Sequence, residues 1–465
     1  MTAHSYDMIL ADAMIANAEG TFRGSVAVKD GRIADVWHAA EPHEPRADQV
    51  IDCSDRWLLP GGVDPHVHVG ITFGDTVTSE GHLQCSRAAL AGGTTTMVDF
   101  AIPQPGQTPL EAVRRRLEAA DGTSLADYAL HGCFTDRDAD RVEEIGKMAD
   151  LGVRTIKVYT TYRDEMMAGD DLIHEIMTAL RPYGGLTYVH AEDNSVIERR
   201  MEELGRAGDI PFGLIRSARP EEAEDRAVRH VIAMARQAGA PVYFVHQSTA
   251  TALETTRAAR AAGVAAYSEV CPHYMLLDET LYDGEAGECF TCCPPLRSRA
   301  TVDAVAAMVA AGEVDTLGSD HCAFRTEHKT PNTHDLRRMP FGMPGVQTRM
   351  VMTLSEMFIR RRVPMSTLVA LLSTRPAMLS GLYPRKGVIR AGSDADLVVW
   401  DPRGTSVIAG ESLLQDSDYS PFEGWTVHGS IHTVYRGGVA VYGDGAQAAP
   451  GPGSLLGSAP VTLPS

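Results

Sequence analysis

The middle of this chain alternates between short apolar runs and amphipathic stretches, and this alternation restricts the fold more than any other feature of the sequence. Stretches with helical periodicity, such as 108–119, 220–238 and 300–311, separate the runs, and many of them end in glycine. Eight strand-then-helix units over about 320 residues predict a (β/α)8 barrel, the TIM barrel of the α/β class. The number of strands disfavours the competing open, doubly wound sheet. The expected strands lie at residues 57–69, 94–101, 127–135, 155–161, 186–191, 241–247, 263–270 and 314–320.

The two ends of the chain carry a different pattern, in which short apolar runs of strand length are separated by tight turns. The segment Lys29-Asp30-Gly31-Arg32 is a hairpin signal between two of these runs. The runs lie at residues 6–10, 24–28, 386–389, 395–400 and 433–439.

These patterns divide the chain into three parts. We expect residues 1–56 and 385–445 to form one small β-sandwich module, and residues 57–384 to form the catalytic barrel. Residues 446–465 are rich in Gly, Ala, Pro and Ser, which predicts a flexible C-terminal tail.

Composition and charge limit the classes of partner. With 465 residues, of which 44% are hydrophobic and 22% charged, the chain can bury a large core. The net charge of −19 argues against nucleic acid or an anionic membrane surface as a partner. We read neither a signal peptide at the N-terminus nor a run of about 18 apolar residues that would span a membrane, so we expect a cytoplasmic protein.

The eight cysteines are too few for a disulfide scaffold in a chain of this length, and reduced thiols are expected. The cluster Cys289-x-x-Cys292-Cys293 would suit half of a zinc site. The chain has no second Cys-x-x-Cys, so we interpret these residues as ordinary loop thiols.

A barrel places its chemistry at the C-terminal ends of its strands, and here those ends carry side chains that bind metals. The first run ends in His66-Val67-His68, and side chains two apart on a strand point to the same side. Both imidazoles would therefore face one ion. The other candidates are Lys157 in the fourth run, His190 and His246 at the ends of the fifth and sixth, and Asp320 at the end of the eighth.

Each candidate also has an ordinary structural explanation. A His-x-His pair arises by chance in many chains, and a histidine that closes an apolar strand is commonly a hydrogen-bonded core residue. Lys157 would extend its ammonium to the rim or pair with a carboxylate, and Asp320 would cap a helix. Their joint occurrence on one face of a barrel favours a metal site.

Lys157 is the unusual member of the set, because a protonated amine cannot bind a cation. Burial beside metal ions favours the neutral amine, and a neutral amine can add carbon dioxide. The resulting carbamate has two oxygens and would bridge two metal ions, each of which keeps an open position for water.

Several motifs together resemble the cyclic amidohydrolases of the dihydropyrimidinase and hydantoinase family. The resemblance extends from about residue 6 to residue 440, and as a set the motifs are highly specific. They are Gly61-Gly62-Val63-Asp64-Pro65-His66-Val67-His68, Ala101-Ile102-Pro103-Gln104-Pro105-Gly106-Gln107, Ile156-Lys157-Val158-Tyr159, Val189-His190-Ala191-Glu192, Pro294-Pro295-Leu296-Arg297, Gly318-Ser319-Asp320-His321-Cys322 and Gly392-Ser393-Asp394-Ala395-Asp396-Leu397.

The resemblance implies a centre of two divalent metal ions, with Zn²⁺ as the expected metal. A metal-bridging hydroxide would attack a ring carbonyl, and Asp320 would pass its proton to the leaving nitrogen. Tyr162 matches the family's hydrogen-bond donor to the developing negative charge, although a rim aromatic with its hydroxyl in water is the structural alternative. One ion would be bound by His66, His68 and Asp320 and the other by His190 and His246, with N6-carboxylated Lys157 as the bridge.

The implied substrate is a small cyclic amide, and the implied product is an N-carbamoyl amino acid. Relatives that open allantoin or dihydroorotate have similar metal ligands but lack the counterpart of Tyr162. Tyr162 and the segment 103–107 therefore favour 5,6-dihydropyrimidines or hydantoins. We expect the segments 72–81 and 162–171 to line the entrance, and the resemblance implies a homo-oligomer, a tetramer or a dimer.

Two departures from the family pattern leave the exact substrate open. Cys293 replaces the usual serine before Pro-Pro-Leu-Arg, and Phe341 replaces the usual asparagine. Either residue would contact the substrate through its backbone or its side chain. The remaining alternatives are an allantoinase or other cyclic imide hydrolase, and a non-catalytic scaffold of the same fold, which the intact ligand positions disfavour.

Overall fold

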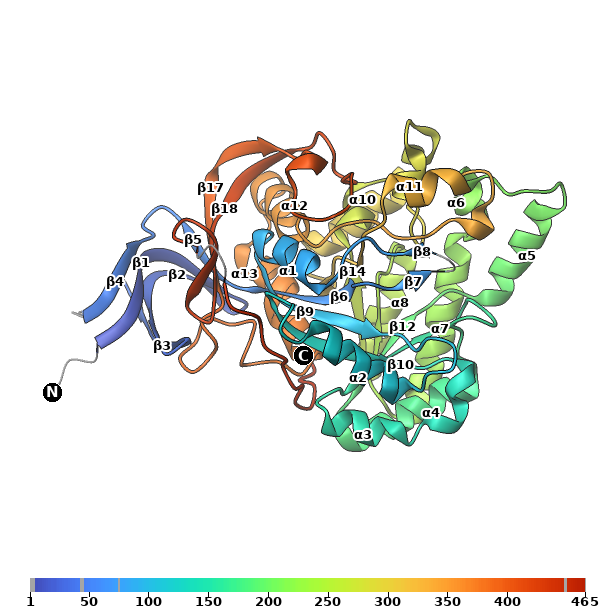
Figure 1. Ribbon diagram of the computed structural model, residues 1–465, viewed down its shortest axis with the longest axis horizontal. Coiled ribbons are helices and arrows are strands. Elements are labelled where there is room, and N and C mark those ends of the chain that lie inside the picture. The colour runs from blue at the N-terminus through green and yellow to red at the C-terminus, as the bar shows by residue number, and fades with distance from the viewer. Residues whose placement is uncertain (1–4, 42–45, 74–75, 447–449, 465) are drawn as a thin grey trace.

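The computed structural model describes residues 5–41, 46–73, 76–446 and 450–464, which form a barrel and a strand-rich module built from both ends of the chain (Figure 1). The barrel prediction is confirmed. Its strands pair in the order β6-β9-β10-β11-β12-β13-β14-β15, each pair is parallel, and β16 pairs back onto β6. They are β6 (Gly62–His68), β9 (Thr94–Ala101), β10 (Asp127–Cys133), β11 (Thr155–Tyr159), β12 (Leu186–His190), β13 (Val242–Phe244), β14 (Ala266–Val270), β15 (Thr316–Leu317) and β16 (His321–Cys322).

The ring of strands closes at its eighth segment, which is split into two short pieces. β15 pairs with β14, while β16 pairs with β6 through His321 opposite Val67 and Cys322 opposite His68. Between the pieces, Ser319 donates its backbone N–H to Asp64 Oδ1 (3.0 Å) and its hydroxyl to the His66 carbonyl (3.1 Å). The gap of residues 318–320 therefore joins the two ends of the sheet, and we call it the seam.

Helices cover the outer side of the barrel. The three helices predicted from periodicity are confirmed within one residue at each end, as α2, α7 and α10. The capping box of Thr108 and Glu111 begins α2. In the described part of the chain no helix combines the length and apolarity that crossing a membrane requires. The helices are α1 (His82–Ala91), α2 (Pro109–Ala120), α3 (Glu144–Asp150), α4 (Asp170–Leu180), α5 (Asn194–Gly205), α6 (Ile215–Ala218), α7 (Glu221–Ala238), α8 (Ala250–Ala261), α9 (Pro272–Leu276), α10 (Arg299–Ala310), α11 (Thr326–Lys329), α12 (Arg349–Thr353), α13 (Met365–Val369) and α14 (Arg375–Leu379).

The strand-rich module is one sheet with the order β19-β18-β17-β5-β1-β2-β3, in which β4 also pairs with β1. Figure 1 shows how β17 and β18, near the end of the chain, lie beside β5, near its beginning. The predicted hairpin is present, with Asp30 and Gly31 in the left-handed region as a tight turn requires. The strands are β1 (Ser5–Asn17), β2 (Gly20–Lys29), β3 (Arg32–His38), β4 (Arg46–Asp52), β5 (Trp57–Pro60), β17 (Leu397–Val407), β18 (Thr426–Arg436) and β19 (Val439–Gly443).

The first expected barrel strand, 57–69, is divided between the two parts, which corrects the sequence interpretation. β5 belongs to the module sheet, and only β6 belongs to the barrel. The break falls at Gly61 and Gly62, where a Cβ atom would lie 2.2 Å from Thr95 Oγ1 and 2.8 Å from Arg349 Nη2, respectively. The close approach of these neighbours requires glycine at the crossing between the sheets.

The C-terminal segment 450–464, for which composition predicted flexibility, packs against the barrel instead. Its backbone bonds to segments that precede or begin successive barrel strands, including Leu456 N–H to Tyr128 O (2.7 Å) and Ser458 N–H to Gly152 O (2.8 Å). Leu456 is 1% exposed among apolar side chains of β6, β9, β10 and α14. Backbone hydrogen bonds and one buried leucine hold this segment, which we call the C-terminal strap, despite its Gly- and Pro-rich composition.

Candidate metal and substrate site

The metal-ligand candidates meet in one cavity at the C-terminal ends of the barrel strands. The cavity has a volume of about 80 Å³ and opens toward a wider entrance of about 930 Å³. Both are lined by Thr72, Ile102, Tyr162, Met166 and Phe341, so the two spaces are continuous. Five candidates, His68, Lys157, His190, His246 and Asp320, line the inner cavity.

His66, His68 and Asp320 form the first group of ligand atoms. Asp320 Oδ1 lies 3.1 Å from His66 Nε2 and 3.3 Å from His68 Nε2, and the two Nε2 atoms are 3.1 Å apart. The group is almost completely buried, and its atoms converge as the ligands of one cation do. Asp320 reaches it from the seam with φ 48°, a left-handed conformation that is uncommon for aspartate.

Glu269 orients His66, and the sequence interpretation did not identify it. Glu269 Oε1 lies 2.7 Å from His66 Nδ1 and accepts the His246 backbone N–H at 2.9 Å. Burial alone would lower the pKa of His66, but the charges of Glu269 and Asp320 raise it to about 9. In the neutral ring Nδ1 keeps its proton and donates it in a hydrogen bond to Glu269, so the unprotonated Nε2 presents its lone pair to the other ligand atoms. The sequence signal that could have identified Glu269 is a carboxylate inside the apolar run 263–270.

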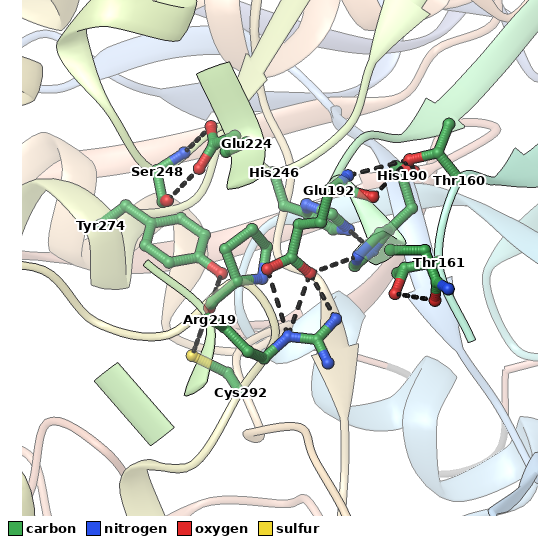
Figure 2. Close-up of polar contacts among 12 residues, drawn as sticks. Thr160, Thr161, His190, Glu192, Arg219, Glu224, His246, Ser248, Tyr274 and Cys292 are labelled. Atoms are coloured by element: carbon green, nitrogen blue, oxygen red, sulfur yellow. Dashed lines mark hydrogen bonds and ion pairs between the residues drawn. The ribbon is translucent and has the colours of Figure 1, made fainter. Parts of the chain in front are cut away.

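His190 and His246 form the second group. His190 Nδ1 lies 3.0 Å from His246 Nε2, while the other nitrogen, Nε2, lies 2.7 Å from Glu192 Oε2 (Figure 2). Burial lowers the pKa of His190 to about 4 despite the opposing effect of Glu192, so the ring is neutral at pH 7. Glu192 therefore fixes the tautomer in which Nδ1 presents its lone pair. Glu192 stands in the motif Val189-His190-Ala191-Glu192, but its role was not predicted.

Lys157 lines the cavity that members of both groups line, and it is 1% exposed. Its Nζ is 4.9 Å from the ring centres of Phe100 and Tyr159. Burial lowers the pKa of Lys157 to about 8, mainly because the charged form loses its hydration. A substantial fraction of neutral amine is therefore available near pH 7 to 8, as carbamate formation requires.

These residues fit a divalent metal centre. Four imidazoles and a carboxylate are hard-to-borderline donors of the kind that Zn²⁺ prefers. Facing ring nitrogens at 3.0 and 3.1 Å, with carboxylates on the outer nitrogens of His66 and His190, are the arrangement that a cation between the rings requires.

Tyr162 lies at the wall of the same cavity, with its ring centre 5.5 Å from that of His190. Its φ of 68° is left-handed, and its carbonyl accepts the backbone N–H groups of Glu165, Met166 and Met167. Burial raises the pKa of Tyr162 well above its usual value, so the hydroxyl stays protonated and can donate. The position matches the sequence prediction, while the role remains a prediction.

Cys293 and Phe341 also line the inner cavity. Burial raises the pKa of the Cys293 thiol to about 12, so this sulfur is no thiolate nucleophile. Phe341 precedes Gly342, whose Cβ position would overlap Cys322, so the segment passes close to the end of β16. All eight cysteines are buried and free of disulfides.

A second close group, Glu80, Cys85 and His321, lies beside the seam. His321 Nε2 is 3.1 Å from Glu80 Oε2, and His321 Nδ1 accepts the Gly345 backbone N–H at 3.0 Å. Both ring nitrogens already have hydrogen-bond partners, so His321 serves the structure of the seam and has no free nitrogen for a metal.

Comparison with known proteins agrees with this geometry. The Amidohydrolase family model matches residues 57–441. The D-hydantoinase of Ralstonia pickettii is 32% identical over 94% of this chain and 96% of its own length. A D-phenylhydantoinase of Escherichia coli O1:K1 is 33% identical over 94% and 95%, respectively. The crystal structure of dihydropyrimidinase from Brevibacillus agri superposes with a TM-score of 0.92 and 30% identity, covering 98% of this chain and all of that one.

Proposed function

Because the chain belongs to the amidohydrolase family, we propose that it opens a 5,6-dihydropyrimidine or hydantoin ring by hydrolysis and releases an N-carbamoyl amino acid. The chain is an enzyme of the cyclic amidohydrolase class. The observation that carries the ring-opening proposal is the convergence of Asp320, three histidines and a buried lysine on one cavity that Tyr162 also lines, with His66 directly behind His68 and Asp320.

We assign two divalent ions to this centre, with Zn²⁺ as the metal that the donor set suits best. Bound ions would acidify a water molecule and polarise the ring carbonyl. His66, His68 and Asp320 would bind one ion, His190 and His246 the other, and carboxylated Lys157 would bridge them.

Asp320 is the proposed proton carrier. The surrounding histidines hold the pKa of Asp320 well below its usual value against the effect of burial, so its Oδ atoms are unprotonated at pH 7. The carboxylate would accept the proton of the attacking water and deliver it to the ring nitrogen as the C–N bond breaks. The protonated nitrogen becomes the NH2 of the carbamoyl group, and the attacked carbonyl carbon becomes the carboxylate of the N-carbamoyl amino acid.

Tyr162 is the proposed hydrogen-bond donor to the carbonyl oxygen as it gains negative charge. Its hydroxyl keeps its proton, and the buried cavity makes such a bond stronger than it would be in water. The neighbouring thiol of Cys293 is protonated too, so Tyr162 is the stronger donor at this wall.

The entrance supports a substituted ring as substrate. Its apolar members include Ile102, Met166, Ile197, Met201 and Phe341. These side chains would surround an apolar substituent on the ring, while the inner cavity of about 80 Å³ holds the amide that reacts.

The cytoplasmic location and a homo-oligomeric state, tetramer or dimer, belong to the same proposal. Light scattering coupled to size-exclusion chromatography measures the mass in solution, and a monomer would contradict the expected oligomer.

Turnover of a substrate panel by the metal-loaded enzyme tests the reaction. We expect ring opening of dihydrouracil, hydantoin or 5-substituted hydantoins to exceed that of allantoin, with the enantiomer preference measured by chiral analysis of the N-carbamoyl product. Faster hydrolysis of allantoin would favour the allantoinase alternative. A protein with less than one metal per chain and no activity on any ring would support the scaffold alternative.

A further inference from the structure

We propose that Arg219 is a positioning residue that couples the His190 side of the metal centre to Tyr162, an inference that rests on the function proposed above. Arg219 follows α6 and is 6% exposed. Arg219 lines the entrance but is not among the residues that line the inner cavity, and it would act through residues that do.

The first contact of Arg219 is with Glu192. Arg219 Nη2 donates to Glu192 Oε2 at 2.6 Å, and Nε donates to Oε1 and Oε2 at 3.1 and 3.2 Å. The same Oε2 accepts from His190 Nε2 at 2.7 Å. Arg219 therefore holds the carboxylate that selects the tautomer and ring plane of a metal ligand (Figure 2).

The second contact of Arg219 is with the ring of Tyr162. Arg219 Cζ lies 4.9 Å from the ring centre, within the range of a cation–π contact. The guanidinium is planar, so it can lie against an aromatic face while its edge donates to a carboxylate. An ammonium group cannot make both contacts with this geometry.

The third contact is made by the main chain of Arg219. Its carbonyl accepts Arg297 Nη1 at 2.7 Å, and Arg297 Nε donates to Ser248 Oγ at 2.9 Å. Ser248 follows His246 by two residues and also bonds Glu224 (Figure 2). The segments that carry His190 and His246 are thus joined through Arg219 and Arg297.

The energetics of this pair point to geometry rather than stability as its role. A buried ion pair loses hydration that its Coulomb attraction seldom exceeds, so an apolar replacement is often neutral for folding. Glu192 is completely buried, and Tyr162 is held with φ of 68° over the guanidinium. The buried Glu192 carboxylate and the strained Tyr162 both contact the side chain of Arg219. This arrangement fits a residue that fixes the metal-ligand candidate and the hydrogen-bond donor relative to each other.

Arg219→Lys tests the coupling, because lysine keeps the charge and loses the fork and the flat face. We expect metal affinity or content at the His190 side to fall by about 10–100-fold and kcat to fall by a similar factor, with KM changed much less. Double-mutant cycles with Tyr162→Phe separate coupling from general damage. Tyr162→Phe should lower kcat by about 10²-fold in the native background and by less than about tenfold beside Arg219→Lys.

Arg216→Lys is the matched control. Arg216 lies three residues earlier and makes a forked pair with Asp283 at 2.9 and 3.1 Å, on the surface. We expect its metal content and kcat to equal those of the native protein. If Arg219→Lys does not fold, the same experiment uses Glu192→Gln. The glutamine side chain has nearly the volume of glutamate but lacks the negative charge that holds Arg219. We then expect a smaller effect of Tyr162→Phe in the Glu192→Gln background.

Two metals per chain in Arg219→Lys, together with an undiminished effect of Tyr162→Phe, would overturn the coupling. An undiminished effect of Tyr162→Phe beside Glu192→Gln would overturn it as well. Metal content by mass spectrometry does not depend on which ring is opened. Failure of the native enzyme on every ring in the panel would therefore overturn the proposed reaction, and it is distinguishable from failure of the coupling.

Discussion

At the scale of the residue, Lys157 is the proposed bridge between two metal ions. It is buried in the cavity that His68 and His190 also line, and burial lowers the pKa of its amine to about 8. We expect Lys157→Ala to lose most activity and one or both metals, because the bridging carbamate is gone. A short carboxylic acid such as acetate should restore part of both.

Metal analysis and ring-opening assays with and without acetate measure these effects. Lys329→Met is a matched control, since Lys329 is also completely buried but donates to the carbonyl and hydroxyl of Thr291, at 2.9 Å, away from the ligand candidates. This control should retain both metals. A fully active Lys157→Ala protein would rule out the carbamate.

Tyr162 is expected to affect the rate without affecting the metals. Tyr162→Phe removes the hydroxyl that would donate to the developing oxyanion, so kcat should fall by about 10²-fold. Metal content should stay at the native value, because no ligand is altered. Steady-state kinetics and metal analysis on one preparation check both parts, and unchanged kinetics would remove the proposed role.

We expect Lys329 to make the stability of the protein depend on pH. Burial lowers its pKa from 10.5 to about 8, so between these values the unfolded chain binds more protons than the folded one. The contribution of Lys329 to the unfolding free energy is fully present above about pH 10.5. It is lost as the pH falls through about 8, and the total loss is about 3 kcal/mol. Denaturant unfolding should show that, from pH 7 to 10, the unfolding free energy of the native protein rises by part of this amount relative to that of Lys329→Met. A difference in unfolding free energy that stays constant over this pH range would contradict the expected effect of Lys329.

At the scale of the element, the C-terminal strap is the segment whose contribution is easiest to measure. Leu456 is 1% exposed beneath the barrel, whereas Leu455 beside it is 41% exposed. Leu456→Ala should cost about 2–4 kcal/mol of unfolding free energy, because it leaves a cavity against β6, β9 and β10. Leu455→Ala should stay within about 0.5 kcal/mol of the native value.

Thermal and urea unfolding of the two leucine variants make this comparison. Equal stability of both variants would show that the strap adds nothing to the barrel. Activity of the native chain and of Leu455→Ala should be the same, since the strap lies at the end of the barrel away from the site.

Periodicity in the sequence predicted most of the elements, because a strand or helix that buries one face leaves a local pattern. It did not predict the division between β5 and β6, since both segments are apolar and only the closeness of Thr95 and Arg349 to Gly61 and Gly62 separates them. Nor did it predict the strap, which is held mainly by backbone hydrogen bonds that every residue type can make.

At the scale of the whole molecule, metal binding should stabilise the fold. The six ligand candidates come from five separate strands or strand ends, so the unfolded chain holds no comparable site. Removing the metals with a chelator should lower the melting temperature, and adding Zn²⁺ should restore it, with about 4 kcal/mol gained at 1,000 times Kd. Lys157→Ala should show a smaller shift, and an equal melting temperature with and without chelator would contradict the prediction.

The convergence of the ligand candidates was predictable because a barrel brings the ends of its strands together whatever their distance in the sequence. The residues that orient these ligands were not. Glu192 follows His190 by two residues, but Glu269 lies 203 residues from His66, and Arg219 lies 27 residues from Glu192. No spacing in the sequence records such contacts.

The seam has a consequence for how the enzyme becomes active during folding. Asp320 stands in the gap between β15 and β16, where the last strand meets the first. A chain in which β15 and β16 have not yet closed the barrel would lack Asp320, the proposed proton carrier, at the site. The first appearance of turnover in a refolding experiment would therefore report when the barrel closes between β15 and β16.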